Sequence, residues 1–311
     1  MAQISVVSPV FNESACIQAF YTEVSAALSS VTDNWEIVLV DDGSRDDSWQ
    51  QIRQLAGIDI RVRGVRFSRN FGHHIAITAG LDHCDADWVV TMDSDLQDPP
   101  DAIPRLLERA LEGFDVVVAL REGRKHGLIK RMFSRVFYAA YSYLTDTHYD
   151  PRVGVFRIMS RKVVENLRQM RELSRFLTGM VEWVGFAHDA IRVKHRPRHA
   201  GETKYPLHKQ ILLAVNAVLS FSEKPLKFVA YAGLLMSLLS TAYGSYIVYL
   251  ALAGRIVVLG YASLAAAIFF TGGVTVFTVG LVGLYVGRIF RQVQGRPLYV
   301  LAERTDEASR R

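Results

Sequence analysis

The sequence contains very little cysteine, with Cys16 and Cys84 as its two thiols in 311 residues. Two cysteines cannot build a disulfide framework or a thiolate metal cluster, so an apolar core must hold the fold together. We expect both side chains to be reduced, buried thiols. Half of the residues are hydrophobic, and a chain with that composition is not intrinsically disordered.

Charged residues are missing from two long stretches near the C-terminal end. Residues 228–254 and 256–287 contain no Asp, Glu, Lys, Arg or His. A helix of about 20 residues crosses the hydrocarbon core of a bilayer, so each stretch is long enough. We predict a transmembrane hairpin over 224–290, with spans at about 228–252 and 262–287. A pair of buried core helices is the alternative.

We expect no signal peptide, because residues 3–10 are typical of a β-strand that starts at once. Only Arg255 lies between the two apolar stretches. The basic residues flank them on the outer sides: Lys224, Lys227, Arg288, Arg291 and Arg296. The positive-inside rule therefore predicts a multi-pass protein of the inner (plasma) membrane, with the N-terminal domain and both termini in the cytoplasm.

The net charge of +5 conceals two oppositely charged segments. Residues 1–120 hold 8 basic and 19 acidic side chains, whereas residues 121–222 hold 19 basic and 8 acidic ones. The acidic segment suits a ligand that brings a cation or hydrogen-bond donors, and the basic segment suits an anion. We expect no nucleic acid, because the basic residues adjoin the apolar stretches and form no platform for stacking bases.

Runs of Val and Ile alternate with amphipathic segments, and they predict strands at 3–10, 35–42, 61–68, 87–93 and 115–120. Little polar alternation indicates strands buried on both faces, hence a parallel sheet covered by helices. This is a doubly wound α/β fold, which binds ligands at the carboxyl ends of its strands. Further on, we predict strands at 153–159 and 188–196 and helices at 160–170, 174–184 and 207–221. The last of these is amphipathic and is expected in the membrane interface, with an ordinary packing helix as the alternative.

Two acidic pairs fall at predicted strand ends. Asp93 and Asp95 stand one residue apart, a spacing at which two carboxylates can share a divalent cation. Aspartates in a surface turn before Pro99 are the alternative for this pair. Asp41 and Asp42 end another strand. Four carboxylates at one edge repel each other unless a metal ion or a hydrogen-bonding ligand relieves them.

Five motifs in order resemble the family 2 glycosyltransferases, which have the GT-A fold. They are residues 7–13, 40–44, 68–72, 92–100 and 201–205. The C-terminal hairpin ending at 296–299 resembles that of the polyprenyl-phosphate sugar synthases, such as bactoprenol glucosyltransferases and dolichol-phosphate mannose synthases. The resemblance implies a GT-A domain over 1–205, an interfacial helix over 206–223, the hairpin over 224–290 and a cytoplasmic tail over 291–311.

The resemblance also implies roles for residues on the donor side. The nucleotide-sugar pocket would be lined by Pro9, Phe11, Glu13, Asp42 and Asp93. Asp95 and Gln97 would hold Mg²⁺ or Mn²⁺ on the diphosphate, and the catalytic set would be Asp93, Asp95 and Asp150. The donor is expected to be UDP-glucose or another UDP-hexose.

On the acceptor side, a polyprenyl phosphate such as undecaprenyl phosphate is expected to meet basic side chains. We assign its phosphate to Arg69, Arg121, Arg131, Ser134, Arg198 and Lys204. Arginine forks suit phosphate oxygens, although any one of these residues could instead contact anionic membrane lipids.

One position departs from the family pattern. Bactoprenol-glucosyltransferase-like members commonly carry Asp after the glycine at 154, as a candidate general base, but here Val155 follows it. Asp150 matches the mannose-synthase version, with a plain loop residue as the alternative. A strong base is dispensable, because a phosphate monoester with a second pKa near 6 is largely a dianion at pH 7.

The sequence therefore predicts inverting transfer of a hexose to a polyprenyl phosphate, for a cell-envelope glycan or lipopolysaccharide modification. A processive polysaccharide synthase and a non-catalytic lipid-binding membrane protein are the alternatives. We also expect a homo-oligomer, with a tetramer as the candidate. Gly283 and Gly287 form a small-residue pair that can pack helices within the hairpin or between protomers.

Overall fold

The computed structural model describes residues 3–122, 153–173, 175–194, 196, 224–253 and 261–308. The chain forms two compact units. One comprises Met1–Ser142, Thr147–Leu207 and Pro297–Arg311, and the other comprises Tyr143–Asp146 and His208–Arg296. Several predictions lie outside the described residues, namely Arg131, Ser134, Asp150, Arg198, Lys204 and the helix at 207–221.

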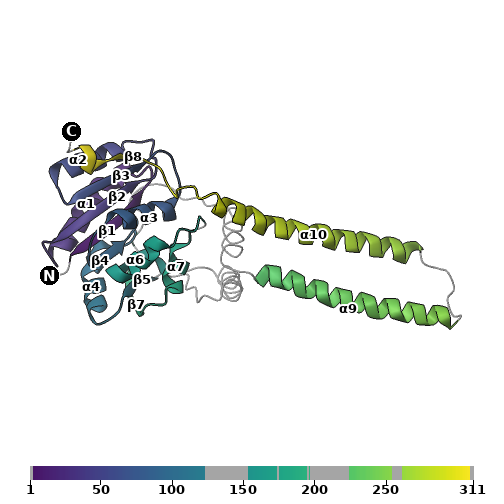
Figure 1. Cartoon of the computed structure of the whole chain (residues 1–311). Helices are drawn as coiled ribbons and strands as arrows, with labels where there is room; N and C mark the ends of the chain where they lie inside the picture. The colour runs from purple at the N-terminus through teal and green to yellow at the C-terminus, as the bar shows by residue number, and fades with distance from the viewer. Residues whose placement is uncertain are drawn as a thin grey trace. The chain divides into compact units, whose positions relative to one another are not determined.

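The described part of the first unit is built on one eight-stranded sheet with the order β7-β5-β6-β4-β1-β2-β3-β8 (Figure 1). The strands are β1 Ile4–Val10, β2 Trp35–Asp41, β3 Val62–Phe67, β4 Trp88–Thr91, β5 Val116–Glu122, β6 Val153–Ser160, β7 His188–Lys194 and β8 Leu301–Arg304. Each strand predicted from the sequence is present within a few residues. The α/β fold class is confirmed.

The parallel arrangement predicted for the strands in residues 1–120 is present, and two further strands, β6 and β8, run in the opposite direction. β1 pairs in parallel with β2 and β4, and β2 with β3, but β6 runs antiparallel to β4 and β5, and β8 runs antiparallel to β3. β6 is buried along most of its length. A run of apolar residues buried on both faces looks the same in either direction, so the hydrophobic pattern does not encode strand direction.

Helices cover both faces of the sheet and enclose two apolar clusters. α1 (Ser14–Ser29), α2 (Ser48–Ile58) and α4 (Ile103–Leu111) pack on one cluster. α3 (His73–His83), α6 (Arg161–Gln169) and α7 (Leu177–Trp183) pack on the other. η1 (Pro100–Ala102) leads into α4.

The sequence of α1 shows how these helices are specified. Ile17, Phe20 and Val24 recur at helical spacing and are fully buried. Burial of a large apolar side chain stabilises the fold by about 1.5–3 kcal/mol. The buried face of α1 thus anchors the loop before it, which carries the first predicted donor residues.

The second unit contains two apolar helices, α9 (Lys224–Leu252) and α10 (Tyr261–Val293). Leu226–Tyr246 and Phe270–Val293 are long and apolar enough to cross a membrane. Large side chains such as Leu235 and Phe277 are more than half exposed. Exposed apolar surface on this scale is typical of a membrane-associated protein.

The chain returns to the sheet after α10. β8 pairs with β3 and forms this edge of the sheet, with Val65 opposite Arg304, Arg66 opposite Glu303 and Phe67 opposite Leu301 (Figure 1). The short helix α11 (Thr305–Ala308) follows it. No strand was predicted in residues 291–311, which were expected to form a cytoplasmic tail. In the structure Pro297–Arg311 belongs to the same unit as the sheet.

Candidate active site

Two loops at the carboxyl ends of β1 and β2 are tied together by hydrogen bonds. The backbone N–H of Asn12 donates to Ser44 Oγ at 2.9 Å, and Arg45 N–H donates to Asn12 Oδ1 at 2.9 Å. Asn12 has φ +54°, a left-handed conformation that Asn adopts more readily than most residues. The backbone N–H of Asp42 donates to Val10 O at 2.9 Å. The two loops therefore form one rigid rim. It is called the donor rim below, because it carries the residues predicted to bind the sugar donor.

Asp42 joins the loop after β3 to this rim. Its buried carboxylate accepts hydrogen bonds from Phe71 N–H at 2.6 Å and from Gly72 N–H at 3.0 Å. Burial raises the pKa of Asp42, and the two backbone bonds act against that rise. Gly43 has φ +71°, and a Cβ there would lie 2.5 Å from the backbone of Arg69. Glycine is thus required where the two loops approach each other.

The structure brings the predicted nucleoside residues together on these loops. Pro9 is buried near the end of β1, whereas the Phe11 side chain is 45% exposed. Glu13 precedes α1, and its N–H donates to Ser48 Oγ at 3.1 Å. An exposed aromatic ring beside a fixed polar loop can stack against a nucleobase.

The loop after β4, residues 93–97, carries the predicted metal ligands and is called the metal loop below. Asp95 Oδ1 accepts a hydrogen bond from Gln97 N–H at 3.1 Å. Leu96 between them has φ +58° although it is a buried, branched residue, and such strain persists only where the surroundings enforce it. Ser94 Oγ donates to Pro9 O at 3.1 Å. The metal loop is thereby fixed to β1 and to the donor rim.

Asp93 is surrounded by charged groups. His73 Nε2 lies 3.5 Å from its Oδ1, and Arg121 Nη2 lies 3.8 Å from its Oδ2. Burial raises the pKa of Asp93 to about 6, His73 and Arg121 lower it, and Asp98 and Asp95 raise it. Within the described residues, Asp93 Oδ1 is buried without a hydrogen-bond partner. An additional cation at this loop would compensate that oxygen.

Arg121, predicted to bind the acceptor phosphate, is held by a carboxylate. Its Nε and Nη2 atoms donate to the two oxygens of Asp98 at 3.1 and 2.9 Å, and Asp98 is fully buried. A Cβ at Gly154 would lie 2.9 Å from Arg121 Cζ. Gly154 therefore leaves room for the guanidinium. The acceptor role of Arg121 stays a prediction, while its pairing with the acidic loop is a finding.

The position of the family's candidate base lies in the core. Val155 is buried in the apolar cluster beside α6 and α7. Two residues further along β6, Arg157 is also buried and donates through Nη2 to Thr178 Oγ1 at 2.9 Å and to Gly154 O at 2.6 Å. The side chain of residue 155 thus serves packing in this chain.

Sequence reasoning missed the two histidines at the start of α3. His73 faces Asp93, and His74 packs edge-on against Phe176. Burial, reinforced by the nearby charges of His73, Arg157 and Arg175, lowers the pKa of His74 to about 4. Their position directly after the motif at 68–72 is the feature of the sequence that could have identified these histidines. Arg69 in that motif is exposed and stacks on Phe71, with its Cζ 4.0 Å from the ring centroid.

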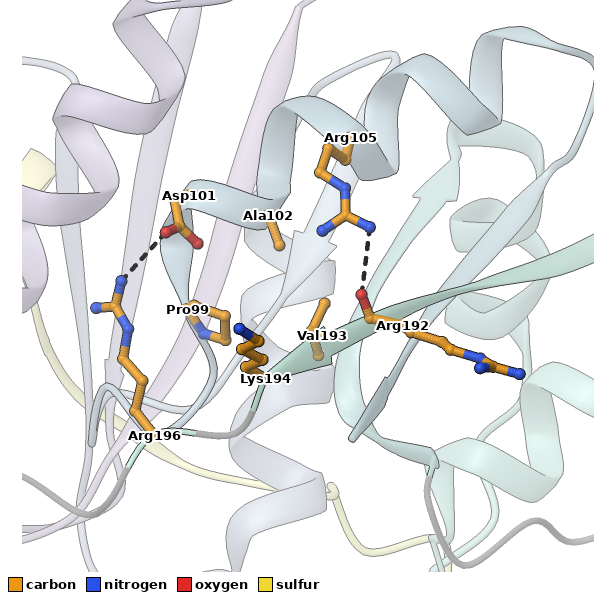
Figure 2. A pocket seen from close by; sticks show the side chains of 8 residues that line it. All are labelled: Pro99, Asp101, Ala102, Arg105, Arg192, Val193, Lys194 and Arg196. Carbon is orange, nitrogen blue, oxygen red and sulfur yellow. Dashed lines mark hydrogen bonds and ion pairs between the residues drawn. The ribbon is translucent and has the colours of Figure 1, made fainter. Parts of the chain in front are cut away.

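A basic groove adjoins the metal loop. It has a volume of about 450 Å³ and is lined by Pro99, Asp101, Ala102, Arg105, Arg192, Val193, Lys194 and Arg196 (Figure 2). Arg196 N–H donates to Gln97 O at 2.9 Å, so one wall of the groove is attached to the metal loop. The Arg196 guanidinium pairs with Glu23 at 2.7 Å and Asp101 at 3.3 Å. The other basic residues of the groove, Arg105, Arg192 and Lys194, give it a net positive charge that suits an anionic group.

The oxygen atoms near Asp95 fit a hard divalent cation that also takes ligand oxygens from a substrate. Carboxylate and amide oxygens are the ligands that Mg²⁺ and Mn²⁺ prefer. Among the described residues, no three His, Cys, Asp or Glu side chains gather as a complete metal site. A cation held by the described residues alone would therefore need further oxygen ligands, such as those of a phosphate.

Comparison with known proteins finds two family models and several relatives that match this chain. The model of glycosyl transferase family 2 matches residues 5–168, and the model of the GtrB C-terminal hairpin matches residues 224–289. The uncharacterized glycosyltransferase YkcC of Bacillus subtilis is 39% identical over 300 residues, covering 96% of this chain and 93% of YkcC. The bactoprenol glucosyl transferase of Shigella phage SfII is 38% identical, covering 96% of this chain and 97% of the phage protein.

Among solved structures, the glucosyl-3-phosphoglycerate synthase of Mycobacterium tuberculosis, in complex with Mn²⁺, UDP and phosphoglyceric acid, is similar in fold. The TM-score is 0.53 at 20% identity, and the match covers 70% of this chain and 76% of that one. The shared part shows that the sheet and its helices have the architecture predicted from the motifs.

Proposed function

The chain belongs to glycosyltransferase family 2, and we propose that it transfers a hexose from a nucleotide sugar to the phosphate of a polyprenyl phosphate. The observation that carries this proposal is the metal loop at Asp93 and Asp95, which is tied to the donor rim on one side and to a basic groove on the other. The apolar hairpin and the name of the phage relative support a lipid acceptor.

For the donor we propose UDP-glucose or another UDP-hexose. The exposed ring of Phe11 is positioned to stack on the base, and Glu13 and Asp42 flank it on the rim. The name of the phage relative specifies glucosyl transfer, and the similar synthase was crystallised with UDP. The name supports glucose as the sugar, and the UDP of the synthase supports a uridine nucleotide.

For the metal we propose Mg²⁺ or Mn²⁺, held by oxygens of Asp95 and Gln97 together with the diphosphate. A bound divalent ion neutralises the charge that develops on the leaving nucleoside diphosphate. Asp93 lies beside His73 and Arg121 and faces the same loop, where it orients the sugar. The strained turn at Leu96 fixes the spacing between these side chains.

The proposed reaction is a direct displacement with inversion. An oxygen of the phosphate dianion forms a bond to the anomeric carbon, and the bond from that carbon to the diphosphate oxygen breaks with its electron pair. No proton moves, because the acceptor is already ionised near pH 7. This explains how the chain can work with Val155 buried in the core. Positioning and charge neutralisation supply the rate acceleration.

We further propose that the catalytic unit and both termini face the cytoplasm, as the basic flanks of the hairpin predict. The lipid-linked sugar would serve cell-envelope glycan or lipopolysaccharide modification. We also propose a homo-oligomer, because the small-residue pair Gly283 and Gly287 would allow helices of two protomers to pack closely, and no described atom beyond the local helix backbone lies within 4 Å of a Cβ built at either position.

The test is an incubation of full-length protein with a panel of nucleotide sugars, Mg²⁺ or Mn²⁺, and undecaprenyl phosphate. We expect one UDP-hexose to give a lipid whose mass increases by a single hexose, with the anomeric configuration inverted by NMR. Undecaprenol without its phosphate is the matched control and should give no product. Addition of many hexoses would indicate a processive synthase, and absence of turnover with every donor would indicate a non-catalytic protein.

A further inference from the structure

The segment after the apolar hairpin is docked firmly on the donor side of the sheet. The Tyr299 ring stacks on Phe67 with centroids 5.0 Å apart and planes at 18°. Ser68 N–H donates to Val300 O at 2.9 Å, and Gly64 N–H donates to Thr305 Oγ1 at 2.9 Å. The chain therefore holds β8 in register on β3 by contacts at both ends of the strand.

Glu303 lies at the centre of this contact. It stands opposite Arg66 in the strand pairing, and Arg66 Nη1 lies 3.0 Å from Glu303 Oε1. Its second oxygen, Oε2, accepts a hydrogen bond from Trp49 Nε1 at 3.0 Å. The bond from Trp49 and the neighbouring Arg66 lower the pKa of Glu303. With both oxygens engaged, the carboxylate fixes the direction of the Arg66 guanidinium.

Arg66 extends from Glu303 to a buried carboxylate. Its Nε atom lies 3.2 Å from Asp41 Oδ2, and the Asp41 side chain is fully buried. Asp41 Oδ2 has no aligned hydrogen bond in the described part of the chain, so the charge of Arg66 is its compensation there. A buried carboxylate that loses its cation is strongly disfavoured. The position of Arg66 therefore decides how Asp41 is stabilised.

Asp41 in turn holds the donor rim. Its Oδ1 atom accepts the Ser44 N–H at 3.0 Å, and Ser44 Oγ accepts the Asn12 N–H at 2.9 Å. These bonds fix the loops that carry Phe11 and Asp42. We propose that Glu303 and Arg66 are positioning residues for the donor nucleotide, through which the strand after the hairpin keeps the rim in its binding geometry. This inference rests on the proposed function, because it requires a nucleotide donor.

The first experiment measures UDP binding with Mn²⁺ by calorimetry, together with the donor KM and kcat of the full-length protein. Glu303→Gln keeps the shape of the side chain and removes its charge, and Arg66→Gln removes the partner of Asp41. Each should weaken UDP binding and raise the donor KM roughly tenfold, with kcat within about twofold. Arg66→Lys, which keeps a positive charge, should recover part of the affinity.

Asp306→Asn is the matched control. Asp306 also lies in the docked segment and pairs with Arg304 at 2.6 Å and Arg63 at 3.6 Å, but neither pair leads to Asp41. A role limited to docking the C-terminal segment would make Asp306→Asn weaken UDP binding as much as Glu303→Gln. The positioning role predicts unchanged UDP binding in this control.

The exchanged double variant Arg66→Glu/Glu303→Arg distinguishes most clearly between positioning of the donor rim and docking of the C-terminal segment. It restores an ion pair between β3 and β8 but places a carboxylate beside Asp41. We expect UDP binding at least as weak as in Arg66→Gln. Recovery of wild-type affinity would overturn the proposal, as would wild-type affinity in both single variants. If the wild-type protein itself binds no nucleoside diphosphate, the proposed function fails as well, so the two failures are distinguishable.

Discussion

The two halves of the sheet stabilise the acidic side chains of their loops in different ways, whereas Asp41 at the end of strand β2 is paired with Arg66. In the half formed by β1, β2, β3 and β8, Asp42 is held by backbone N–H groups of the loop after β3. In the half formed by β4, β6, β5 and β7, Asp98 is held by the guanidinium of Arg121, and Asp93 lies between His73 and Arg121. Backbone bonds fix a pocket, whereas ion pairs can rearrange around an arriving ion or phosphate.

The chemistry is expected to depend most on the ion-binding half. Replacing Asp95 with Ala removes an oxygen that holds the metal and should lower transfer at least 100-fold. The measurement is single-turnover transfer at saturating Mn²⁺, with thermal unfolding as the check on the fold.

Asp87→Asn is the control for this variant, because Asp87 directly precedes strand β4, at the end opposite to Asp95, is exposed, and has its Oδ1 atom 3.5 Å from Arg161 Nη2. Its activity should stay within about twofold of wild type. Near-normal transfer by Asp95→Ala would refute the metal assignment and the comparison built on it.

The next largest effect is expected on stability, at the ion pair under the metal loop. Arg121→Met leaves the fully buried Asp98 without its bidentate partner. The free energy of unfolding should fall by roughly 3 kcal/mol, at the lower end for buried pairs because Arg121 is partly exposed. Urea unfolding in detergent provides the measurement.

The double variant Arg121→Met/Asp98→Asn tests the cause of that loss. Removal of the second charge should recover more than half of the stability, since the buried carboxylate that has lost its guanidinium is what costs energy. Additive losses would mean that packing, and not charge, holds this half together.

Much of the fold could be predicted because the signal is local. The buried strands β1 and β2 are indicated by their high content of Val and Ile, and the helices α9 and α10 are indicated by their lack of charge. The direction of β6 and the existence of β8 could not be predicted. β8 is a four-residue strand, Leu301–Arg304, with two charged residues, and its pairing with β3 joins residues over 230 positions apart.

In the candidate site, too, the local sequence predicts some residues and does not predict the contacts between distant segments. Asp42, Asp93 and Asp95 were predicted because each follows a strand within a motif. The pairing of Arg121 with Asp98 and the position of His73 beside Asp93 depend on side-chain geometry between separate strands and helices. No pattern in one segment encodes such contacts. The chain of contacts from Glu303 to Asp41 was missed for the same reason.

A pH titration should reveal the buried histidine in the half with β6. The folded-state pKa of His74 is lowered to about 4 from 6.5. Between these values the unfolded chain binds more protons, so stability is present above pH 6.5 and is lost as the pH falls toward 4. We expect a loss of about 3 kcal/mol, measured as the free energy of unfolding against pH.

His74→Gln should remove most of this pH-dependent loss while lowering the overall stability at pH 7. The free energy of unfolding should then change only slightly with pH, because of the other groups that titrate in this range. An unchanged slope in His74→Gln would assign the acid sensitivity to other side chains.

The smallest effect is expected where β8 docks on the donor half. Tyr299→Phe removes the hydrogen bond from the Tyr299 hydroxyl to Asp82 Oδ2 at 2.9 Å but keeps the ring stacked on Phe67. Asp82 also accepts two bonds from Arg171, so its carboxylate stays satisfied. The free energy of unfolding should fall by about 1 kcal/mol, measured by urea unfolding. A loss as large as that of Arg121→Met would show that this half, too, depends on a few irreplaceable side-chain contacts.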